Sequence, residues 1–253
     1  MKNSCQFQKS KKYVLGLLLV YFSAFANNPK EAYIFSYSSG KSFDGLHFAW
    51  SIDQINWHPI GPEYSYIHSD YGRWGSEKRM VSPLLFQDVN GLWHCLWSLN
   101  EKDGTFAHAS SKDLLYWGRQ LYSVVMTDKN CLTPDITFNK EKGEYTISWL
   151  SKDQTENKAW NTTTKDFKKY SATKNIPLTE YKNSRSTIVI EGKSQTGSVN
   201  KVAWNLVDGL IKAQQLSAYK NQLWSETTKT DKKRFADLKP VEAKFTLDAT
   251  KTK

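Results

Sequence analysis

The chain has 253 residues, of which 14% are aromatic and 24% charged, and its formal net charge is +10. The positive charge comes mainly from Lys in polar, turn-rich segments, whereas a nucleic-acid-binding face favours clustered Arg and aromatic residues. Beyond the first 26 residues no apolar run is long enough to cross a bilayer. Composition and charge therefore argue against a nucleic-acid partner and against a membrane span.

The first 26 residues have the pattern of an export signal. Three lysines between positions 9 and 12 precede the apolar segment Tyr13 to Phe22, and Ala24-Phe25-Ala26 is typical of a signal-peptidase site. We expect this segment to be removed and the protein to be exported, to the periplasm or outside the cell. Without it the net charge falls to about +6.

Two strands are predicted next, at Glu31 to Tyr37 and at Gly45 to Trp50, on either side of the turn at Ser39-Gly40. The connection from Pro59 to Arg79 that follows is long and rich in aromatic and charged residues. Long loops on a rigid scaffold often carry function, so this connection is a candidate for ligand contacts.

Four short antiparallel strands in a row are predicted in the middle of the chain. The first three are Leu84 to Gln87, Leu92 to Ser98 and Thr105 to Ser110, and the fourth follows Trp117. Asn-Gly and Asp-Gly pairs between them supply the positive φ angles that tight hairpins need. One such unit cannot bury both of its faces, so similar units are expected elsewhere in the chain.

A short motif recurs in the chain. Ser51 to Trp57 and Ser111 to Trp117 share the pattern S-x-D-x-x-x-W, and Thr164 to Tyr170 is a looser third copy. We expect the hydroxyl and carboxylate side chains to bond the turn backbone, with the three aromatic residues in equivalent positions. Four-stranded units that recur at a regular spacing are typical of a β-propeller.

After the third motif-bearing unit the pattern becomes weaker. No hairpin partner is recognisable after Gly192. The expected elements of the last half are strands at Leu132 to Phe138 and Glu144 to Trp149, and a strand at Arg185 to Glu191 that opens a fourth unit. A helix at Trp204 to Trp224 and an extended stretch from Phe235 to Leu247 follow.

These patterns predict an all-β fold, a β-propeller of four-stranded antiparallel blades of which about three are recognisable, with a short C-terminal α/β tail. The expected domains are a signal peptide at 1–26, propeller blades at 27–192, and a tail or linker at 193–253 that leads toward a possible downstream domain.

Spacings typical of zinc sites, phosphate-binding loops and serine-hydrolase elbows are missing from the sequence, so no metal and no cofactor is expected. After removal of the signal the chain keeps Cys95 and Cys131. A disulfide between them is compatible with an exported protein, and two buried thiols are equally compatible.

Three strings of the sequence resemble the β-propeller of family 43 of the glycoside hydrolases, in particular family-43-like proteins of gut Bacteroidetes linked with arabinan and xylan breakdown. They are DGLHFAWSIDQINW, GLWHCLWSLNEKDGTFAHASSKDLLYW and LTPDITFNKEKGEYTISW. The resemblance covers roughly residues 30 to 190. The tail is similar to the segment that precedes the catalytic barrel of certain bacterial α-L-arabinofuranosidases, which implies a larger parent protein or a truncated gene.

The resemblance implies a set of carboxylates on the inner strands, one acid and one base across the glycosidic bond, with a third that tunes the acid. Relatives carry Arg-Asp-Pro where this chain has Val81-Ser82-Pro83, so the base position is a Ser. The carboxylate at Asp135 is kept. The next acid would fall near Arg185 to Thr187, where this chain has none.

Asp135 is therefore the candidate catalytic or ligand-contacting residue, with a turn-capping role as the alternative. Tyr71 is a further aromatic candidate, and for each aromatic candidate a packing role is the alternative. Asp70 could substitute for a missing carboxylate. The candidate substrate-binding residues are Ser82, Arg79, Trp74, Trp97 and Glu77.

Two functions follow from the resemblance. One is an exported hydrolase that releases arabinofuranose or xylose from plant-type polysaccharide by direct inversion. The other is a degenerate propeller that binds a glycan, or packs beside a downstream catalytic domain, without cleaving anything. The missing carboxylates at Ser82 and near Ser186 favour the second.

Overall fold

The computed structural model describes residues 29–38, 45–62, 64–70, 79–153 and 156–235. The chain divides into two compact units, Met1–Ile211 and Lys212–Lys253. The first unit holds all the described strands. The predicted export signal and the extended stretch expected after residue 235 lie outside the described ranges, so both stay predictions.

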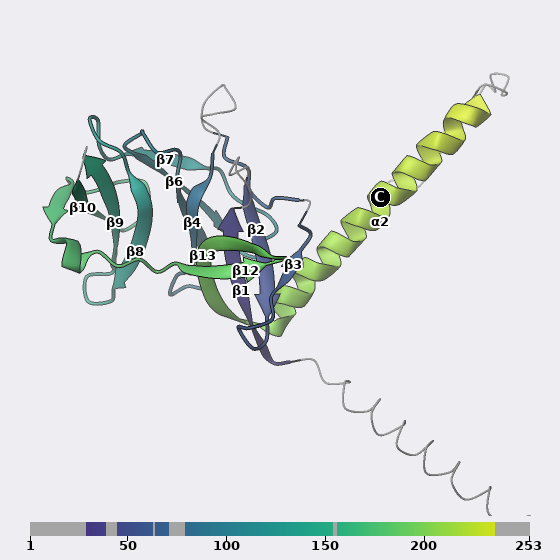
Figure 1. The fold of residues 1–253 in the computed structure, drawn as a ribbon, viewed down its shortest axis with the longest axis horizontal. Helices are drawn as coiled ribbons and strands as arrows, with labels where there is room; N and C mark the ends of the chain where they lie inside the picture. Colours follow the sequence, from purple (N-terminus) through teal and green to yellow (C-terminus); the bar gives the residue numbers. More distant parts are fainter. Residues whose placement is uncertain (1–28, 39–44, 63, 71–78, 154–155, 236–253) are drawn as a thin grey trace, which may run out of the picture. The chain divides into compact units, whose positions relative to one another are not determined.

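The described strands form three antiparallel sheets (Figure 1). Sheet A has the strand order β12-β13-β1-β2-β3, sheet B the order β4-β5-β6-β7, and sheet C the order β11-β10-β9-β8. The bounds are β1 Glu31–Ser38, β2 Leu46–Ser51, β3 His58–Ile60, β4 Val81–Gln87, β5 Trp93–Ser98, β6 Thr105–Ser111, β7 Leu121–Val124, β8 Leu132–Asn139, β9 Glu144–Asp153, β10 Glu156–Thr164, β11 Lys174–Ile176, β12 Ser186–Ile190 and β13 Lys193–Ala203.

The antiparallel, mostly β architecture agrees with the sequence-based expectation, and sheet B coincides with the predicted four-stranded unit. Strand β10 was not predicted. Its sequence, ENKAWNTTT, is dominated by polar residues, yet it pairs with β9 over its whole length. Strand β9 supplies the apolar side chains of this hairpin, among them the buried Ile147 and Trp149.

Strand β13 is the hairpin partner that the sequence analysis did not recognise after Gly192, so that expectation was wrong. It pairs with β12 on one side and with β1 on the other, and thereby joins sheet A instead of opening a fourth sheet. Its polar residues have partners in sheet B. Ser198 Oγ accepts a hydrogen bond from the Leu85 amide at 2.8 Å, and Asn200 Nδ2 donates to the Leu85 carbonyl at 2.9 Å.

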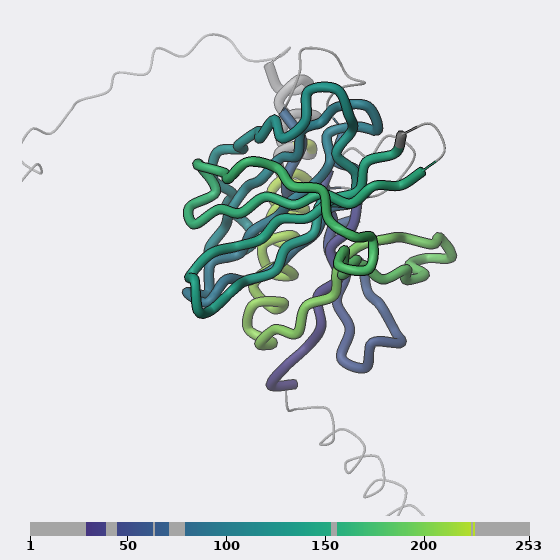
Figure 2. The backbone as a smooth tube through the Cα atoms, turned by 90° about the vertical axis from the view of Figure 1, so that its left-hand side faces the viewer, coloured from purple at the N-terminus to yellow at the C-terminus, as the bar shows by residue number. Residues whose placement is uncertain are grey.

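Gly197 allows β13 to approach β1 closely. A Cβ atom at this position would overlap the carbonyl oxygen of Ser36 and touch the ring of Phe35. Glycine is therefore required where the backbones of the two strands meet. The connection that brings the chain from β11 back to this hairpin can be followed in green in Figure 2.

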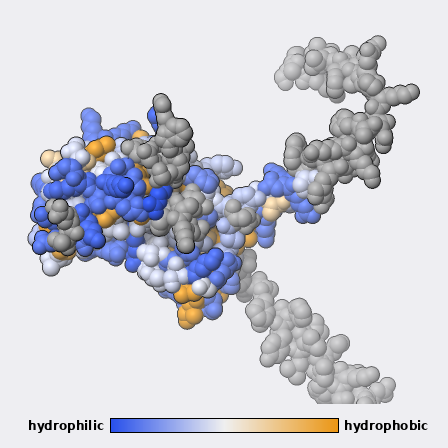
Figure 3. Space-filling model, turned by 45° about the horizontal axis from the view of Figure 1, so that its top comes forward, coloured by the Kyte–Doolittle hydropathy of each residue, from blue (hydrophilic) through white to orange (hydrophobic). Residues whose placement is uncertain are grey.

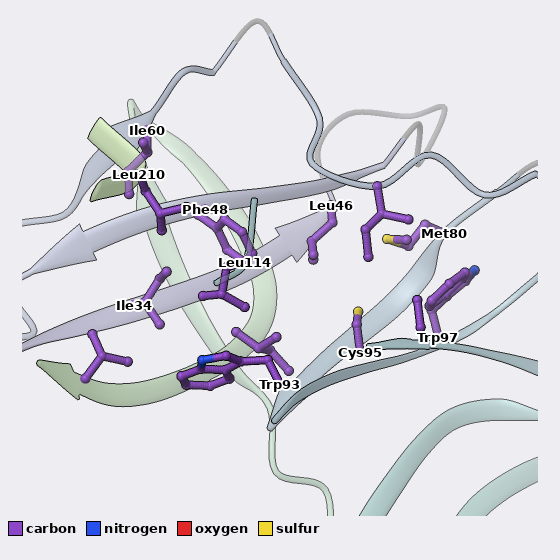
Figure 4. Close-up of a cluster of buried hydrophobic side chains, with 14 of the residues drawn as sticks. Ile34, Leu46, Phe48, Ile60, Met80, Trp93, Cys95, Trp97, Leu114 and Leu210 are labelled. Carbon is purple, nitrogen blue, oxygen red and sulfur yellow. The ribbon is translucent and has the colours of Figure 1, made fainter. Parts of the chain in front are cut away.

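Two large apolar clusters hold the three sheets together. The first contains side chains of sheets A and B, and Figure 4 shows ten of its members by name. The second contains side chains of sheets B and C, with Trp149 and Phe106 fully buried. Full burial of one such side chain contributes roughly 1.5–3 kcal/mol, so these clusters dominate the stability of the unit.

The expected helix is α2, Trp204–Phe235, which begins at the expected residue but continues past Trp224. Val207 and Leu210, in its first turns, are buried in the cluster of sheets A and B. In the second unit Leu216 and Tyr219 are exposed. Among the described residues, no helix combines the length and the hydropathy that a membrane crossing requires.

The three copies of the turn motif have the same hydrogen bonds, as predicted. In each copy the first hydroxyl oxygen accepts bonds from the amides two and three positions later. The Asp Oδ1 likewise accepts bonds from the amides two and three positions after it, and all twelve distances lie between 2.8 and 3.3 Å. Side-chain acceptors thus satisfy the turn backbone.

The closing aromatic residues are also equivalent. Trp57 and Trp117 donate their indole N–H to the carbonyl of the fourth motif residue at 3.1 and 3.0 Å, and the hydroxyl of Tyr170 takes the same role at 3.1 Å. That fourth residue has a positive φ in all three copies, between 57° and 63°.

The fourth motif residue also connects neighbouring sheets. Leu114 is fully buried in the cluster of sheets A and B, and Phe167 is buried in the cluster of sheets B and C. Gln54, in the first copy, is exposed. The described chain has no sheet before sheet A, so the first motif carries a polar residue where the others carry an apolar one.

Cys95 and Cys131 are both buried and free, which answers the question that the sequence left open. Cys95 lies in β5 and belongs to the cluster of sheets A and B, whereas Cys131 precedes β8 and belongs to the cluster of sheets B and C. Burial raises the pKa of both thiols, so neither is reactive near neutral pH.

Candidate functional site

Two matching irregularities mark the starts of β4 and β8. Each is a residue before a proline, Ser82 and Thr133, with φ of 51° and 47°, and each lies in a register shift of the strand pair. Positive φ is uncommon outside glycine and disfavoured for a β-branched residue. Proline has no amide to contribute to the ladder, so it occurs at such bulges.

Asp135 lies directly after the second of these bulges and is 1% exposed. Its Oδ2 accepts the Ser184 amide at 2.6 Å, and its Oδ1 accepts the Ser184 hydroxyl at 3.0 Å and the Ile136 amide at 2.8 Å. Both carboxylate oxygens are thus occupied by groups from the segment that precedes β12 and from its own strand.

Arg185 completes the surroundings of this carboxylate. Its Nη1 lies 3.6 Å from Asp135 Oδ2, and both side chains are 1% exposed. Its other nitrogens donate to the carbonyls of Ser82, at 2.7 and 3.1 Å, and of Pro134, at 2.7 Å. The guanidinium therefore ties the two bulges together from the inside, and burial lowers its pKa.

Tyr181 holds the second bulge from the same segment. Its hydroxyl contacts the carbonyl oxygen and the side-chain oxygen of Thr133 at 2.8 and 2.9 Å. Burial raises the pKa of this hydroxyl, so it remains a donor. The strained Thr133 backbone and the strained Ser82 backbone are both stabilised by side chains of residues 181–185.

In this arrangement the carboxylate of Asp135 is buried and bonded to protein groups. Inverting glycosidases hold two carboxyl groups about 6.5–9.5 Å apart, and retaining ones about 5–5.5 Å apart, with room for the sugar between them. The partners of Asp135 are Ser184, Arg185 and a main-chain amide. None of these is an acid, and both Asp135 and Arg185 are 1% exposed.

The structure distributes the other predicted site residues as follows. Ser82 contributes its carbonyl oxygen to Arg185. Arg79 is paired with the half-exposed Glu101. Trp97 is 0% exposed and its indole N–H lies 3.4 Å from the Ser69 hydroxyl, so its ring faces have no room for a sugar.

Three further candidates, Trp74, Glu77 and Tyr71, lie outside the described residues, and their roles stay predictions. Asp70 is described and exposed, and its amide donates to Gln120 at 3.2 Å. The candidates that the structure brings together are therefore Ser82 and Asp135, and Arg185 is the group that joins them.

A second cluster of titratable groups lies at the junction of sheets B and C. His94 and His108 contact each other through ring nitrogens at 2.8 Å, and His94 Nε2 lies 3.4 Å from Asp88 Oδ2. Phe167 stacks on His108 with a centroid distance of 4.3 Å. Desolvation lowers the pKa of His94 and lowers that of His108 to about 3, so both rings are neutral at pH 7.

In the described part of the chain, no group of three or more His, Cys, Asp or Glu residues is arranged to hold a metal ion. Three residues that matter for Asp135 were missed in the sequence: Tyr181, Ser184 and Arg185. The only signal was the position of Arg185 in the stretch where the resemblance implies an acid. Tyr116, which precedes Trp117 of the second motif, is 81% exposed and was not among the predicted site residues.

Neither a protein-family model nor a curated protein matches the sequence. Among solved structures the chain is similar to an endo-1,4-β-xylanase from Bacteroides thetaiotaomicron, with a TM-score of 0.46 and 15% identity over 66% of this chain and 58% of that one. It is also similar to an exo-β-1,3-galactanase from Clostridium thermocellum, with a TM-score of 0.33 and 11% identity over 67% and 51%. The chain thus spans little more than half the length of these structures.

Proposed function

We propose that this chain is an exported carbohydrate-binding or accessory module of the arabinan- and xylan-degrading type. Its three sheets would be blades of an incomplete propeller with glycosidase ancestry, and it would not cleave glycosidic bonds. Support for the ancestry comes from the resemblance of residues 30 to 190 and from the three equivalent turns, one per sheet.

The observation that carries the non-catalytic part of the proposal is the saturation of Asp135. Ser184 donates to both oxygens of the one family carboxylate that the sequence keeps, and Arg185 Nη1 lies 3.6 Å from one of them. A general acid or base must reach the substrate within hydrogen-bond distance, and each such group typically contributes about 10²–10⁴-fold. A buried, ion-paired Asp135 cannot supply this assistance.

The first test is hydrolysis of aryl arabinofuranosides and aryl xylosides by the purified protein. We expect release of the chromophore at the rate of the buffer control. Ser82→Asp should leave it there, because a base without an acid is not sufficient for inversion. Robust turnover that disappears in Asp135→Asn, with the variant still folded, would instead establish a hydrolase.

The second test is binding, measured as retardation of the native protein in gels that contain arabinan or xylan, with a starch gel as the control polysaccharide. We expect retardation by one of the two plant polysaccharides and none by starch. Equal mobility in all three gels would contradict glycan binding and leave attachment to a downstream catalytic domain as the role of the module.

A further inference from the structure

The open edge of β12, in sheet A, is longer than three other edge strands: β3 at the opposite edge of the same sheet, β7 in sheet B and β11 in sheet C. Strands β3 and β11 have three residues each, and β7 has four. Strand β3 also contains Pro59, and β11 begins with Lys174, both of which discourage pairing. Strand β12, with the sequence STIVI, has five residues, no proline and no charge.

The hairpin geometry shows which backbone groups of β12 are open. The turn Glu191-Gly192 has positive φ at both residues, 49° and 76°, and closes the pair Ile190↔Lys193. In such a two-residue hairpin the closing pair is hydrogen-bonded, and the pattern alternates along the ladder. Ile190 and Ile188 therefore bond β13, whereas the amides and carbonyls of Thr187 and Val189 point to the open side.

The side chains at this edge leave it accessible. Val189 is 62% exposed and Thr187 is exposed. Ile188 and Ile190 pack against the small cluster on sheet A that contains Phe35. On the face shown in Figure 3 hydrophilic residues dominate.

We propose that two copies of this chain associate by antiparallel pairing of β12 with β12, around a two-fold axis at Ile188. In this register Thr187 of each copy lies opposite Val189 of the other. Those are the two residues whose backbone groups are open, so each pair forms two hydrogen bonds and the dimer gains four. The edge is thus complementary to itself, as an isologous interface requires.

The register also avoids unfavourable side-chain contacts. The outward face brings Val189 of one copy against Thr187 of the other, a β-branched pair that suits neighbouring strands. No charged side chain of β12 lies in the paired segment. Continuous main-chain bonding would join the two copies of sheet A into one larger sheet, by the mode in which strands add to an exposed sheet edge.

Sedimentation velocity of the full chain over a wide concentration range tests the association, with Val189→Pro as the main variant. Proline removes an amide that bonds nothing inside the hairpin, so the fold is kept while two of the four intermolecular bonds are lost. We expect dimerisation at least roughly tenfold weaker. Val189→Thr keeps the amide and is the matched control, for which we expect a dimer.

Disulfide trapping tests the register. Ile188→Cys, in a Cys5→Ser background, places two thiols on the two-fold axis in a pair without hydrogen bonds, where Cα atoms lie about 4.5 Å apart, within the range of a disulfide. We expect a covalent dimer on oxidation. Thr187→Cys in the same background faces Val189 of the other copy and should cross-link far less.

Three results would overturn the proposal. The first is a wild-type chain that stays monomeric at the highest concentrations. The second is a dimer that Val189→Pro does not weaken, which would assign the contact to another surface. The third is cross-linking that is equal for both cysteine variants, which would exclude this register.

Near-UV circular dichroism establishes that Val189→Pro is folded. Val189→Lys, which places a charge at the edge, is the second blocking variant.

Discussion

Asp135 and Arg185 form a buried pair whose hydrogen bonds reach three segments of the chain: β4, β8 and the segment that precedes β12. Each side chain alone would be an uncompensated charge in the protein interior. Together they hold two strained pre-proline residues in a conformation that a free chain rarely adopts. A residue that family resemblance marks as catalytic is here part of a structural network, and the difference lies entirely in its partners.

Removal of one member of this pair should be more damaging than removal of both. We expect Arg185→Leu to lower the free energy of unfolding by about 3–5 kcal/mol, because Asp135 remains buried without its counter-ion. The double variant Asp135→Leu with Arg185→Leu should recover part of this loss. Chemical denaturation of the wild type, both single variants and the double variant gives the coupling energy.

A suitable control is Arg79→Leu, because its ion pair with Glu101 is at the surface and should contribute at most about 1 kcal/mol. If Arg185→Leu were no worse than Arg79→Leu, the buried pair would not be a structural tie. The case that Asp135 is unavailable for catalysis would then fail with it.

At the scale of elements, the second and third turn motifs link sheets B and C each to the sheet before it, through Leu114 and Phe167. The hydroxyl and carboxylate fix the turn, the positive φ of the fourth residue turns its side chain toward the neighbouring sheet, and the closing aromatic bonds that residue's carbonyl. Tyr170 satisfies the same carbonyl as a tryptophan would. The motif therefore depends on donor position and not on the identity of the aromatic ring.

The junction of sheets B and C depends on neutral histidines. Phe167 of the third motif packs on His94 and His108, with Asp88 and Tyr145 as the titratable groups beside them. Burial lowers the pKa of His108 to about 3, whereas in the unfolded chain it is about 6.5. Between these values the unfolded chain binds a proton that the folded chain does not.

Stability should therefore be fully present above pH 6.5 and decrease as the pH falls below it. For His108 alone the slope is about 1.4 kcal/mol per pH unit, and His94, whose pKa is also lowered, adds to it. Thermal unfolding at pH values from 7.5 to 4.5 measures this, with His108→Phe as the variant. The variant should show a flatter dependence.

Carboxylates contribute in a separate range. Amide hydrogen bonds, from Asn56 and from Lys169 respectively, lower the pKa of Asp53 and of Asp166 in the turns, so their contribution is lost only at more acidic pH. An acid-induced loss between pH 6.5 and 4.5 that is equally steep in His108→Phe would assign the effect to other groups and contradict the histidine explanation.

At the scale of the whole first unit, β13 completes sheet A and connects it to sheet B. This strand lies between β12 and β1 in sheet A and is hydrogen-bonded through its side chains to β4 of sheet B. Residues far apart in sequence, such as Phe35 and Val199, are direct neighbours in this ladder. The unit therefore needs its last strand before its first sheet is complete.

Truncated chains test whether β13 is required for folding or is a dispensable tail. A chain that ends at residue 192 lacks β13, so one edge of β1 loses its partner and Leu85 loses its bonds to Ser198 and Asn200. We expect this chain to be insoluble or unfolded. A chain that ends at residue 220 keeps β13 together with Val207 and Leu210 of α2, and should unfold within a few degrees of the full chain. Circular dichroism melts of both decide the matter. A folded 1–192 chain would show that β13 is not required.

The sequence by itself determined what depends on local spacing. The three turns and the strands of sheet B follow from residues a few positions apart, because hydroxyl, carboxylate and Asn-Gly patterns act on their own backbone. The exception is strand β10, which was not predicted because its mostly polar sequence lacks the alternation of apolar and polar residues that indicates a strand.

Only the tertiary structure decided which distant segments meet. The pairing of β13 with β1, the burial of Trp97 and the neutralisation of Asp135 by Arg185 depend on contacts between residues widely separated in sequence. An isolated Asp after a proline has the same local pattern whether it faces a substrate or a guanidinium. Its role follows from what the rest of the chain places beside it, since burial and counter-ion together set the chemistry of a carboxylate.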